Sequence, residues 1–299
     1  MEEVNPLKSK IRVPKIYLRL PSGGRYNKQQ IHLSNSGELP IRAMTARDEL
    51  LIRNPDALLN GDAVEKLINS CVPEIQDVRE SPVNDTDIIL LAIKYATYGD
   101  KFEFTVKCPK CDSENKKTLS IRSMLDSATD LPQFTSVTLD DGCELFLRPY
   151  SFENSNKASL MEFDSKKRLQ YVQATYSRLE GIDPAEIENA ESVARKQMAD
   201  LFISMADFSL SLMIDSITQI NVMQGEVKSV VSDKKFIEEY VNNLDPSSVD
   251  KIKDKLKELS NYGVDKKTNI TCIKPECSNI WETEVGFDQS NFFAPTSEV

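Results

Sequence analysis

The strongest constraint on this fold is a set of four cysteines arranged as two distant pairs. Cys108 and Cys111 form a C-x2-C turn, and Cys272 and Cys277 form a C-x4-C turn near the other end of the chain. A closed tetrahedral zinc site needs four such ligands, and both spacings fall within the range of zinc-binding turns. The sequence therefore predicts one zinc ion bound by all four thiolates, fastening the end of the chain to its middle.

The two cysteine segments share one plan of strand, cysteine turn, polar turn and strand. They read FTVKCPKCDSENKKTLSI and TNITCIKPECSNIWETEVGF. Two such hairpins facing one another make a zinc ribbon, here split by a long insertion. Four thiolates leave the ion no open position for water, so the predicted site is structural, and Lys107, Lys110 and Lys274 offset part of its negative charge.

Other interpretations of the cysteines remain open in the sequence. The C-x-x-C pair could be a redox motif, although that motif usually opens a helix and here it lies between expected strands. The four residues could also be unrelated thiols. Cys71 falls on the apolar stripe of an expected helix that Asp62 caps, which favours a buried side chain over a reactive thiol. Cys143 leaves the turn of an expected hairpin, as a sheet residue or as a fifth thiolate near the metal.

Composition indicates a soluble globular protein. Among the 299 residues, 40% are hydrophobic and 28% are charged. The N-terminus shows no apolar segment typical of a signal peptide, and no apolar run of membrane-spanning length is evident. We therefore expect folding in the cytosol, where thiols stay reduced and cysteine clusters favour metal over disulfides.

Charge and residue usage argue against two functional classes. The net charge is -10, and the short basic runs are mixed with acids, as on a solvated surface rather than a nucleic-acid-binding patch. The chain has one histidine, His32, and no glycine-rich phosphate loop or H-E-x-x-H motif. The sequence thus predicts a protein that is not an enzyme and has no catalytic residues.

The pattern of elements predicts an α+β fold in three parts. Residues 1–153 read as a mixed strand and helix domain that carries the first cysteine turn. Residues 154–265 read as an inserted helical subdomain, and residues 266–299 complete the ribbon and add an aromatic tail. Within the first part, Asp85 or Asp87 is expected to start a helix that ends near Gly99.

Two apolar features could serve as contacts with other proteins. The longest expected helix, residues 192–217, carries a continuous stripe: Met198, Leu201, Phe202, Met205, Phe208 and Leu212. We expect this stripe to belong to the core, with an adaptable partner surface as the alternative. Phe292 and Phe293 near the C-terminus are expected to pack into a groove of this chain or of a neighbour.

Several segments together resemble a known family. LPSGGRY, IRAMTARDELLIRNPDALLNGDAVEKLINSCVPEI, DIILLAIKYATYGD before CPKC, and LFLRPYSF form one series. The series resembles the baseplate hub proteins of T-even-like contractile-tailed bacteriophages, and the final cysteine pair with FFAP is similar to the end of the longer, zinc-binding members. The helical insertion, from about Asn154 to Gly263, would then be specific to the larger phages.

The resemblance implies a structural or assembly role in the viral tail. Its expected partners are other baseplate hub proteins and tail-tube or tape-measure proteins in a symmetric assembly, without membrane or sequence-specific nucleic acid. The expected location is the virion, after assembly in the host cytoplasm. Two alternatives remain: a zinc-ribbon nucleic-acid or transcription adaptor, which the acidic WETEVGFDQ disfavours, and a metal-dependent hydrolase, for which His32 stands alone.

Overall fold

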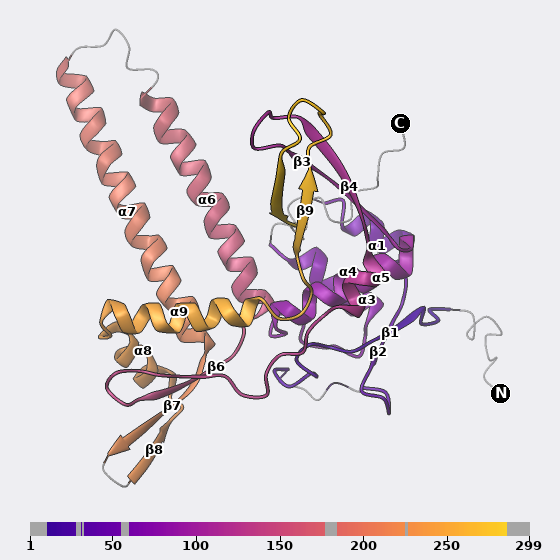
Figure 1. Ribbon diagram of the computed structural model, residues 1–299. Coiled ribbons are helices and arrows are strands. Elements are labelled where there is room, and N and C mark those ends of the chain that lie inside the picture. The colour runs from indigo at the N-terminus through magenta and orange to yellow at the C-terminus, as the bar shows by residue number, and fades with distance from the viewer. Residues whose placement is uncertain are drawn as a thin grey trace, which may run out of the picture. The chain divides into compact units, whose positions relative to one another are not determined.

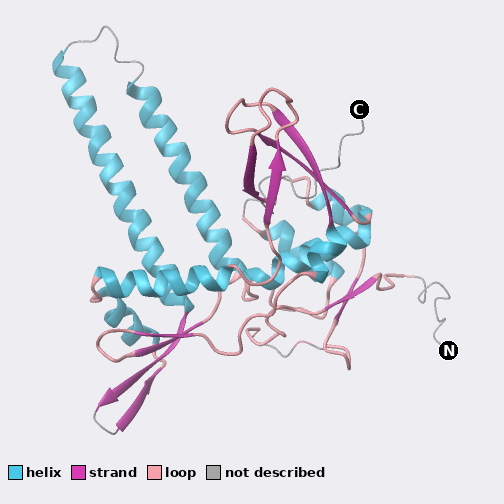
Figure 2. Cartoon of the chain, viewed as in Figure 1, coloured by secondary structure: helices cyan, strands magenta, loops and turns pink. Residues whose placement is uncertain are grey.

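The computed structural model divides the chain into two compact units (Figure 1). It describes residues 11–27, 31, 33–54, 60–176, 184–224 and 227–285, so His32, Phe292 and Phe293 lie outside the described residues. Unit 1 comprises residues 1–133 and 258–299, and unit 2 comprises residues 134–257. The three domains expected from the sequence, 1–153, 154–265 and 266–299, stay a prediction. The α+β fold class is confirmed (Figure 2).

Unit 1 is built around one buried helix. Its elements are β1 (Ile16–Leu18), β2 (Leu39–Ile41), α1 (Ala46–Leu51), α3 (Asp62–Cys71), α4 (Val83–Tyr98), β3 (Lys101–Lys107), β4 (Glu114–Ser120), α5 (Ile121–Asp126), β9 (Lys267–Thr271) and β10 (Ile280–Glu284). Helix α4 is apolar around most of its circumference and buries Ile88, Ile89, Leu91 and Ile93. A helix of that kind needs neighbours on every side, and the antiparallel β1–β2 pair, α3 and α5 contact it.

Two expected helix starts are corrected by the structure. Asp62 does not cap α3, because Gly61 occupies the N-cap with φ 78° and Asp62 instead pairs with Arg79. Helix α4 begins at Val83 after Pro82, ahead of the expected Asp85. The Asp85 carboxylate has another role: it accepts hydrogen bonds from the backbone N–H and hydroxyl of Ser22 and so ties the LPSGGRY loop to the helix.

Asn84 of α4 is hydrogen-bonded to the end of α9 (Pro246–Ser260) and to the residues that follow it. Its side-chain amide donates to the carbonyls of Leu259 and Tyr262, at 3.0 and 2.8 Å. Gly263 follows with φ 88°, a conformation that favours glycine, and forms a bridge with Thr129. These contacts position the entry to β9 within unit 1.

Unit 2 combines a four-stranded antiparallel sheet with four helices among its described residues. Its elements are β5 (Ser136–Thr138), β6 (Glu144–Leu147), α6 (Phe152–Tyr176), α7 (Pro184–Ser216), β7 (Ile217–Gln224), β8 (Val227–Val231), α8 (Lys234–Asn242) and most of α9 (Pro246–Ser260). The sheet order is β5-β6-β7-β8. The β7–β8 pair corrects our expectation that this region is almost wholly helical. Its run of Ile217, Ile220 and Val222 has the β-branched character of a strand.

Helix α7 corrects a second expectation, because most of its apolar stripe is not core. Leu201 is 4% exposed, yet Phe202 is 61% and Met205 is 40% exposed. By length and composition, Ser192–Ser216 could also cross a membrane, which corrects our statement that no apolar run reaches that length. Helical periodicity identified the helix correctly but did not show what covers its apolar surface.

Candidate metal centre

The two cysteine turns cap two antiparallel hairpins of unit 1. In the first, β3 pairs with β4 from Lys101↔Ser120 to Lys107↔Glu114, and Cys108 follows directly. In the second, β9 pairs with β10 from Lys267↔Glu284 to Thr271↔Ile280, and Cys272 follows directly. Each strand register therefore delivers the first cysteine of a pair to the tip of its hairpin.

Backbone hydrogen bonds fold both tips in the same way. The N–H of Cys108 donates to the carbonyl of Ser113 at 2.9 Å, and the N–H of Cys272 donates to that of Asn279 at 2.8 Å. Each turn also contains one residue with positive φ, Asp112 at 54° and Ser278 at 43°. Asp and Ser are short polar residues, and Asp is among the side chains that tolerate this region best. Matching turns thus form despite different cysteine spacings.

The structure brings the four sulfur atoms together. The Sγ atoms of Cys108 and Cys277 are 3.8 Å apart, those of Cys111 and Cys272 are 3.6 Å apart, and all four lie within 4.8 Å of one another. A tetrahedron with Zn–S bonds of about 2.3 Å has sulfur–sulfur edges of about 3.8 Å. A disulfide would need about 2.05 Å. The donor set and its spacing fit a zinc ion.

The sulfur cluster has an uneven electrostatic environment. The Ser113 hydroxyl lies 3.0 Å from the Cys111 sulfur and 3.2 Å from the Cys272 sulfur. These contacts lower the pKa of Cys111 to about 6 and also lower the pKa of Cys272. For Cys277, the Asn279 backbone N–H lowers the pKa, but burial and the neighbouring thiols outweigh it and raise the value to about 11. A cation among the sulfurs would favour the ionised form of Cys277.

Asn115 joins the two hairpins independently of the sulfurs, a role that the sequence analysis missed. Its side chain is 3% exposed, its Nδ2 donates to the carbonyl of Ser113, and its Oδ1 accepts from the N–H of Ile273, both at 2.7 Å. Both polar atoms are satisfied, so the buried amide holds the two tips in register. In the sequence, the only hint of this role is that Asn115 is an amide residue in an expected strand close to the cysteine ligands.

The remaining cysteines stand apart from the cluster. Cys71 is fully buried in α3, which confirms the expectation of a buried side chain, and burial raises its pKa to about 12. Cys143 belongs to unit 2, where it is 8% exposed and its N–H donates to Asp141 in the turn before β6. Cys143 thus precedes β6 instead of lying in a strand as expected, and its thiol interacts with Tyr240.

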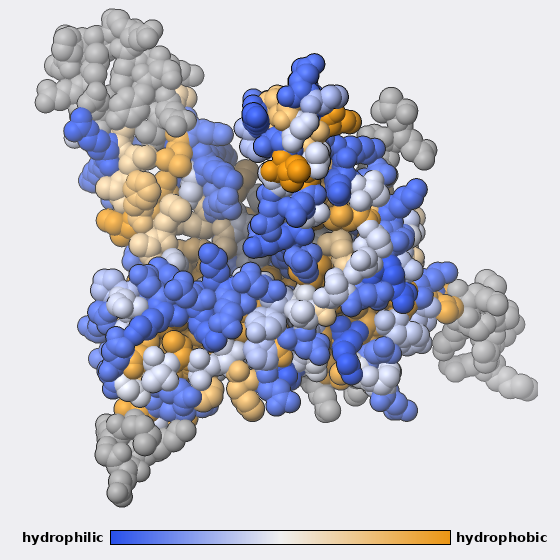
Figure 3. Space-filling view, viewed as in Figure 1, coloured by the Kyte–Doolittle hydropathy of each residue, from blue (hydrophilic) through white to orange (hydrophobic). Residues whose placement is uncertain are grey.

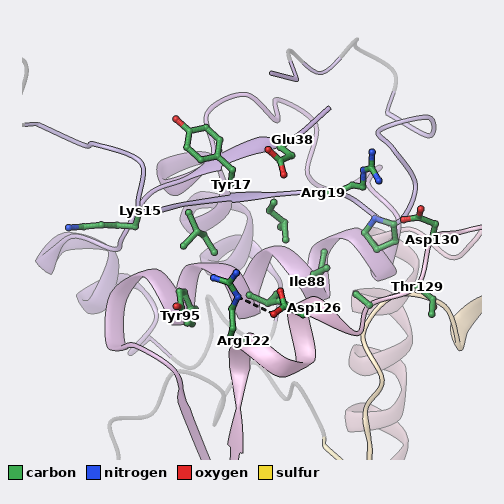
Figure 4. Close-up of a pocket in the computed structure, with 15 residues that line it drawn as sticks. Lys15, Tyr17, Arg19, Glu38, Ile88, Tyr95, Arg122, Asp126, Thr129 and Asp130 are labelled. Carbon is green, nitrogen blue, oxygen red and sulfur yellow. Dashed lines mark hydrogen bonds and ion pairs between the residues drawn. The ribbon is translucent and has the colours of Figure 1, made fainter. Parts of the chain in front are cut away.

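A separate pocket in unit 1 offers a second place for ligands. It has a volume of about 480 Å³, between β1 and the α4–α5 pair (Figure 4). Tyr17, Arg19 and Glu38 line one side, and Arg122 and Asp126 form an ion pair of 3.1 Å on the other. Its lining residues include no cysteine, histidine or serine, so the usual pairing of a nucleophile with a histidine base is missing from this lining.

Comparison with known proteins gives the family. A family model described as T4 bacteriophage base plate protein matches residues 13–294, which is most of the chain. Searches among curated proteins and among solved structures find no significant match. The chain therefore belongs to the T4 bacteriophage base plate protein family and is a structural component of a phage baseplate, a multi-subunit assembly in the tail of the virion.

Proposed function

We propose that this chain is a non-catalytic component of the central hub of the baseplate, built around a structural zinc site. The ligands are Cys108, Cys111, Cys272 and Cys277, arranged as a split zinc ribbon. The observation that carries this proposal is the convergence of four sulfur atoms within 4.8 Å from two hairpins that are distant in sequence. Zinc bound there would cross-link the C-terminal hairpin to the N-terminal part of the chain.

The donor set supports a structural rather than a catalytic role. Catalytic zinc sites keep a position for water or substrate, whereas four thiolates occupy every position of a tetrahedral site. Four thiolates around a dication also leave a net charge near -2, which makes the ion a weak Lewis acid. The backbone turns and Ser113 hold the sulfurs in place, and Lys110 and Lys274 within the two turns add positive charge.

The insertion between the two halves of the ribbon offers a surface for contacts with other baseplate proteins. The ribbon closes within unit 1, so the inserted unit 2 can contact neighbouring proteins without interrupting unit 1. We propose that other hub proteins and tail-tube or tape-measure proteins are those neighbours. The chain's acidic balance disfavours nucleic acid as a partner.

Elemental analysis of the purified protein tests the metal site. We expect one zinc per chain, lost in Cys272→Ser. Cys143→Ser is the matched control, because it changes a buried cysteine of unit 2. Full zinc content in Cys272→Ser would overturn the split site, and loss of zinc in Cys143→Ser would show that the ligand set is wrong.

Electron cryomicroscopy of purified tails tests the hub assignment. The expected result is density for this chain at the central hub, with the ribbon visible as a four-stranded knob. Density at the periphery of the baseplate would contradict the hub role while leaving the baseplate family intact. Density absent from finished tails but present on assembly intermediates would assign the chain to assembly instead of the mature virion.

A further inference from the structure

The α6–α7 hairpin exposes an apolar surface on one side of α7. We call this surface the α7 outer face; it consists of Ala199, Phe202, Ile203, Ala206 and Leu210. Phe202 and Ile203 are 61% and 60% exposed, Ala199 and Ala206 are exposed, and Leu210 is half-buried. Figure 3 shows apolar surface gathered along this hairpin. Large contiguous apolar surface on a helix commonly marks an interaction site.

Two different apolar seams run along α7. The inner seam, of which Met198 and Leu201 line the groove against α6, consists of Ala194, Met198, Leu201, Met205, Phe208 and Leu212, at alternating spacings of four and three residues. The outer face repeats the same spacing in Ala199, Ile203, Ala206 and Leu210. Over these four positions the spacing is the one that coiled-coil seams use, in which side chains of one helix fit between those of another. Within the hairpin the inner seam is covered in part, at Ala194 and Leu201, whereas the outer face remains exposed.

The packing between α6 and α7 leaves the hairpin dependent on further contacts. A groove of about 470 Å³ opens between them, lined on α6 by Lys167 and Arg168 and on α7 by Met198 and Leu201. Few of the described residues in the outer half of this hairpin are buried, as Ser165, Ala194 and Leu201 are. Bundles of four helices solve this problem by enclosing seams on all sides.

Charges on the hairpin favour a protein partner over a lipid bilayer. Asp200 and Asp207 interrupt the apolar part of α7, and both are exposed. On α6, Glu162 pairs with Lys166 and Asp164 pairs with Arg168, again at exposed positions. Inserting the hairpin into hydrocarbon would bury these charges at a cost of several kcal/mol.

We propose that the α7 outer face binds the same face of a second copy of this chain, with the two α7 helices parallel. In a parallel pair, Ile203 and Leu210 occupy one set of seam positions, and the small Ala199 and Ala206 occupy the other. The flanking positions then place Arg195 of one copy beside Asp200 of the other, five residues on. An antiparallel pair would instead bring the acidic edges of the two helices, with Asp200 and Asp207, against each other. The inference is independent of the zinc and hub proposals.

Sedimentation equilibrium of the metal-loaded full-length protein tests the association. We expect a mass twice the 33.8 kDa of the chain at high concentration. Ile203→Asp should weaken the dimer by at least about 30-fold, as expected for a residue at the centre of an interface. Ser204→Asp is the matched control, because it adds the same charge one residue away, outside the face. Circular dichroism and zinc content verify that both variants are folded.

Cysteine cross-linking tests the orientation. In the parallel pair, Ala206→Cys should form an intermolecular disulfide on mild oxidation, whereas Ser204→Cys and the wild-type chain should not. Cross-linking only in a mixture of Ile203→Cys with Ala206→Cys would overturn the parallel arrangement. A chain that stays monomeric at all concentrations, or one that is monomeric and co-sediments with anionic phospholipid vesicles, would overturn the self-association.

Discussion

The two cysteine hairpins and the α6–α7 hairpin solve the same problem in different ways. Neither the pair of cysteine hairpins nor the α6–α7 hairpin contains enough buried apolar side chains to be stable alone. The cysteine hairpins bring four sulfurs and the buried amide of Asn115 to a shared point, so each finds its partner inside unit 1. The α6–α7 hairpin has only apolar periodicity, and its outer seam stays exposed. Ligands specify a partner, whereas an apolar face requires only something apolar to cover it.

Removing the metal should have the largest effect, and it should destabilise the cysteine hairpins but not the α6–α7 hairpin. Zinc-binding energies in small peptides run to about 10–16 kcal/mol, whereas a whole domain is stable by about 5–15 kcal/mol. Chelation should therefore release the β9–β10 pair and expose the chain from residue 269 onward to protease. Trp281 on β10 is the only tryptophan, so its fluorescence reports the release, while circular dichroism reports the helices.

Trp281 fluorescence and helical circular dichroism should respond differently to chelation. We expect the Trp281 signal to change and the helical signal to persist, because α6 and α7 share no ligand with the ribbon. Loss of both signals together would mean that the metal holds the main core. An unchanged Trp281 signal after complete zinc removal would mean that Asn115 and the turns suffice without the ion.

The sequence predicted some features of the cysteine hairpins and of the α6–α7 hairpin and missed others for physical reasons. Cysteine spacing indicated which residues converge, since a metal accepts few ligand sets and few geometries. Helical periodicity predicted α7 correctly. The same apolar stripe can pack in a core or in an interface, and for that reason the burial of Phe202 was predicted wrongly. The β7–β8 pair was missed because β7 follows α7, a long helix, with no break between them. The bridge through Asn115 depends on contacts between distant segments, which local patterns do not encode.

A pH effect should distinguish unit 1 from the α6–α7 hairpin. Burial raises the pKa of Asp85 to about 6, although hydrogen bonds from Ser22 oppose the shift. Between about pH 4 and pH 6 the folded state keeps a proton that the unfolded state has released. The free energy of unfolding should therefore fall as pH rises through this window, by at most about 3 kcal/mol, and level off above it.

Hydrogen exchange measured by segment provides the readout for Asp85. Protection of α4 should decrease from pH 4 to pH 6 after correction for intrinsic rates, and Asp85→Asn should flatten that dependence. Protection in α7 should not follow the same curve. An α4 curve that keeps its slope in Asp85→Asn would assign the titration to another group, such as Asp87, whose pKa burial also raises.

Asn115→Ala should weaken the cysteine hairpins without removing a ligand. The change leaves the N–H of Ile273 without its partner and takes one of two donors from the carbonyl of Ser113, which keeps the Cys108 N–H, at a cost of about 1–3 kcal/mol. Loss of a group that orients metal ligands commonly weakens metal binding by about 10–100-fold. Competition with a chromophoric chelator measures the affinity. Thr118→Ala, at an exposed position of the same strand, is the control, and equal affinities in the two variants would show that Asn115 does not position the ligands.

The exposed Glu162–Lys166 ion pair of α6 should give the smallest effect. Glu162 and Lys166 pair at 2.6 Å, but their side chains are 65% and 69% exposed, so water screens the attraction. Glu162→Gln should lower the stability of unit 2 by no more than about 0.5 kcal/mol, as measured by urea unfolding followed at helical wavelengths. A cost near that of Asn115→Ala would mean that this side of α6 is covered in solution. The apolar contact would then extend beyond α7 to both helices of the hairpin, and the charged side of α6 would belong to the interface.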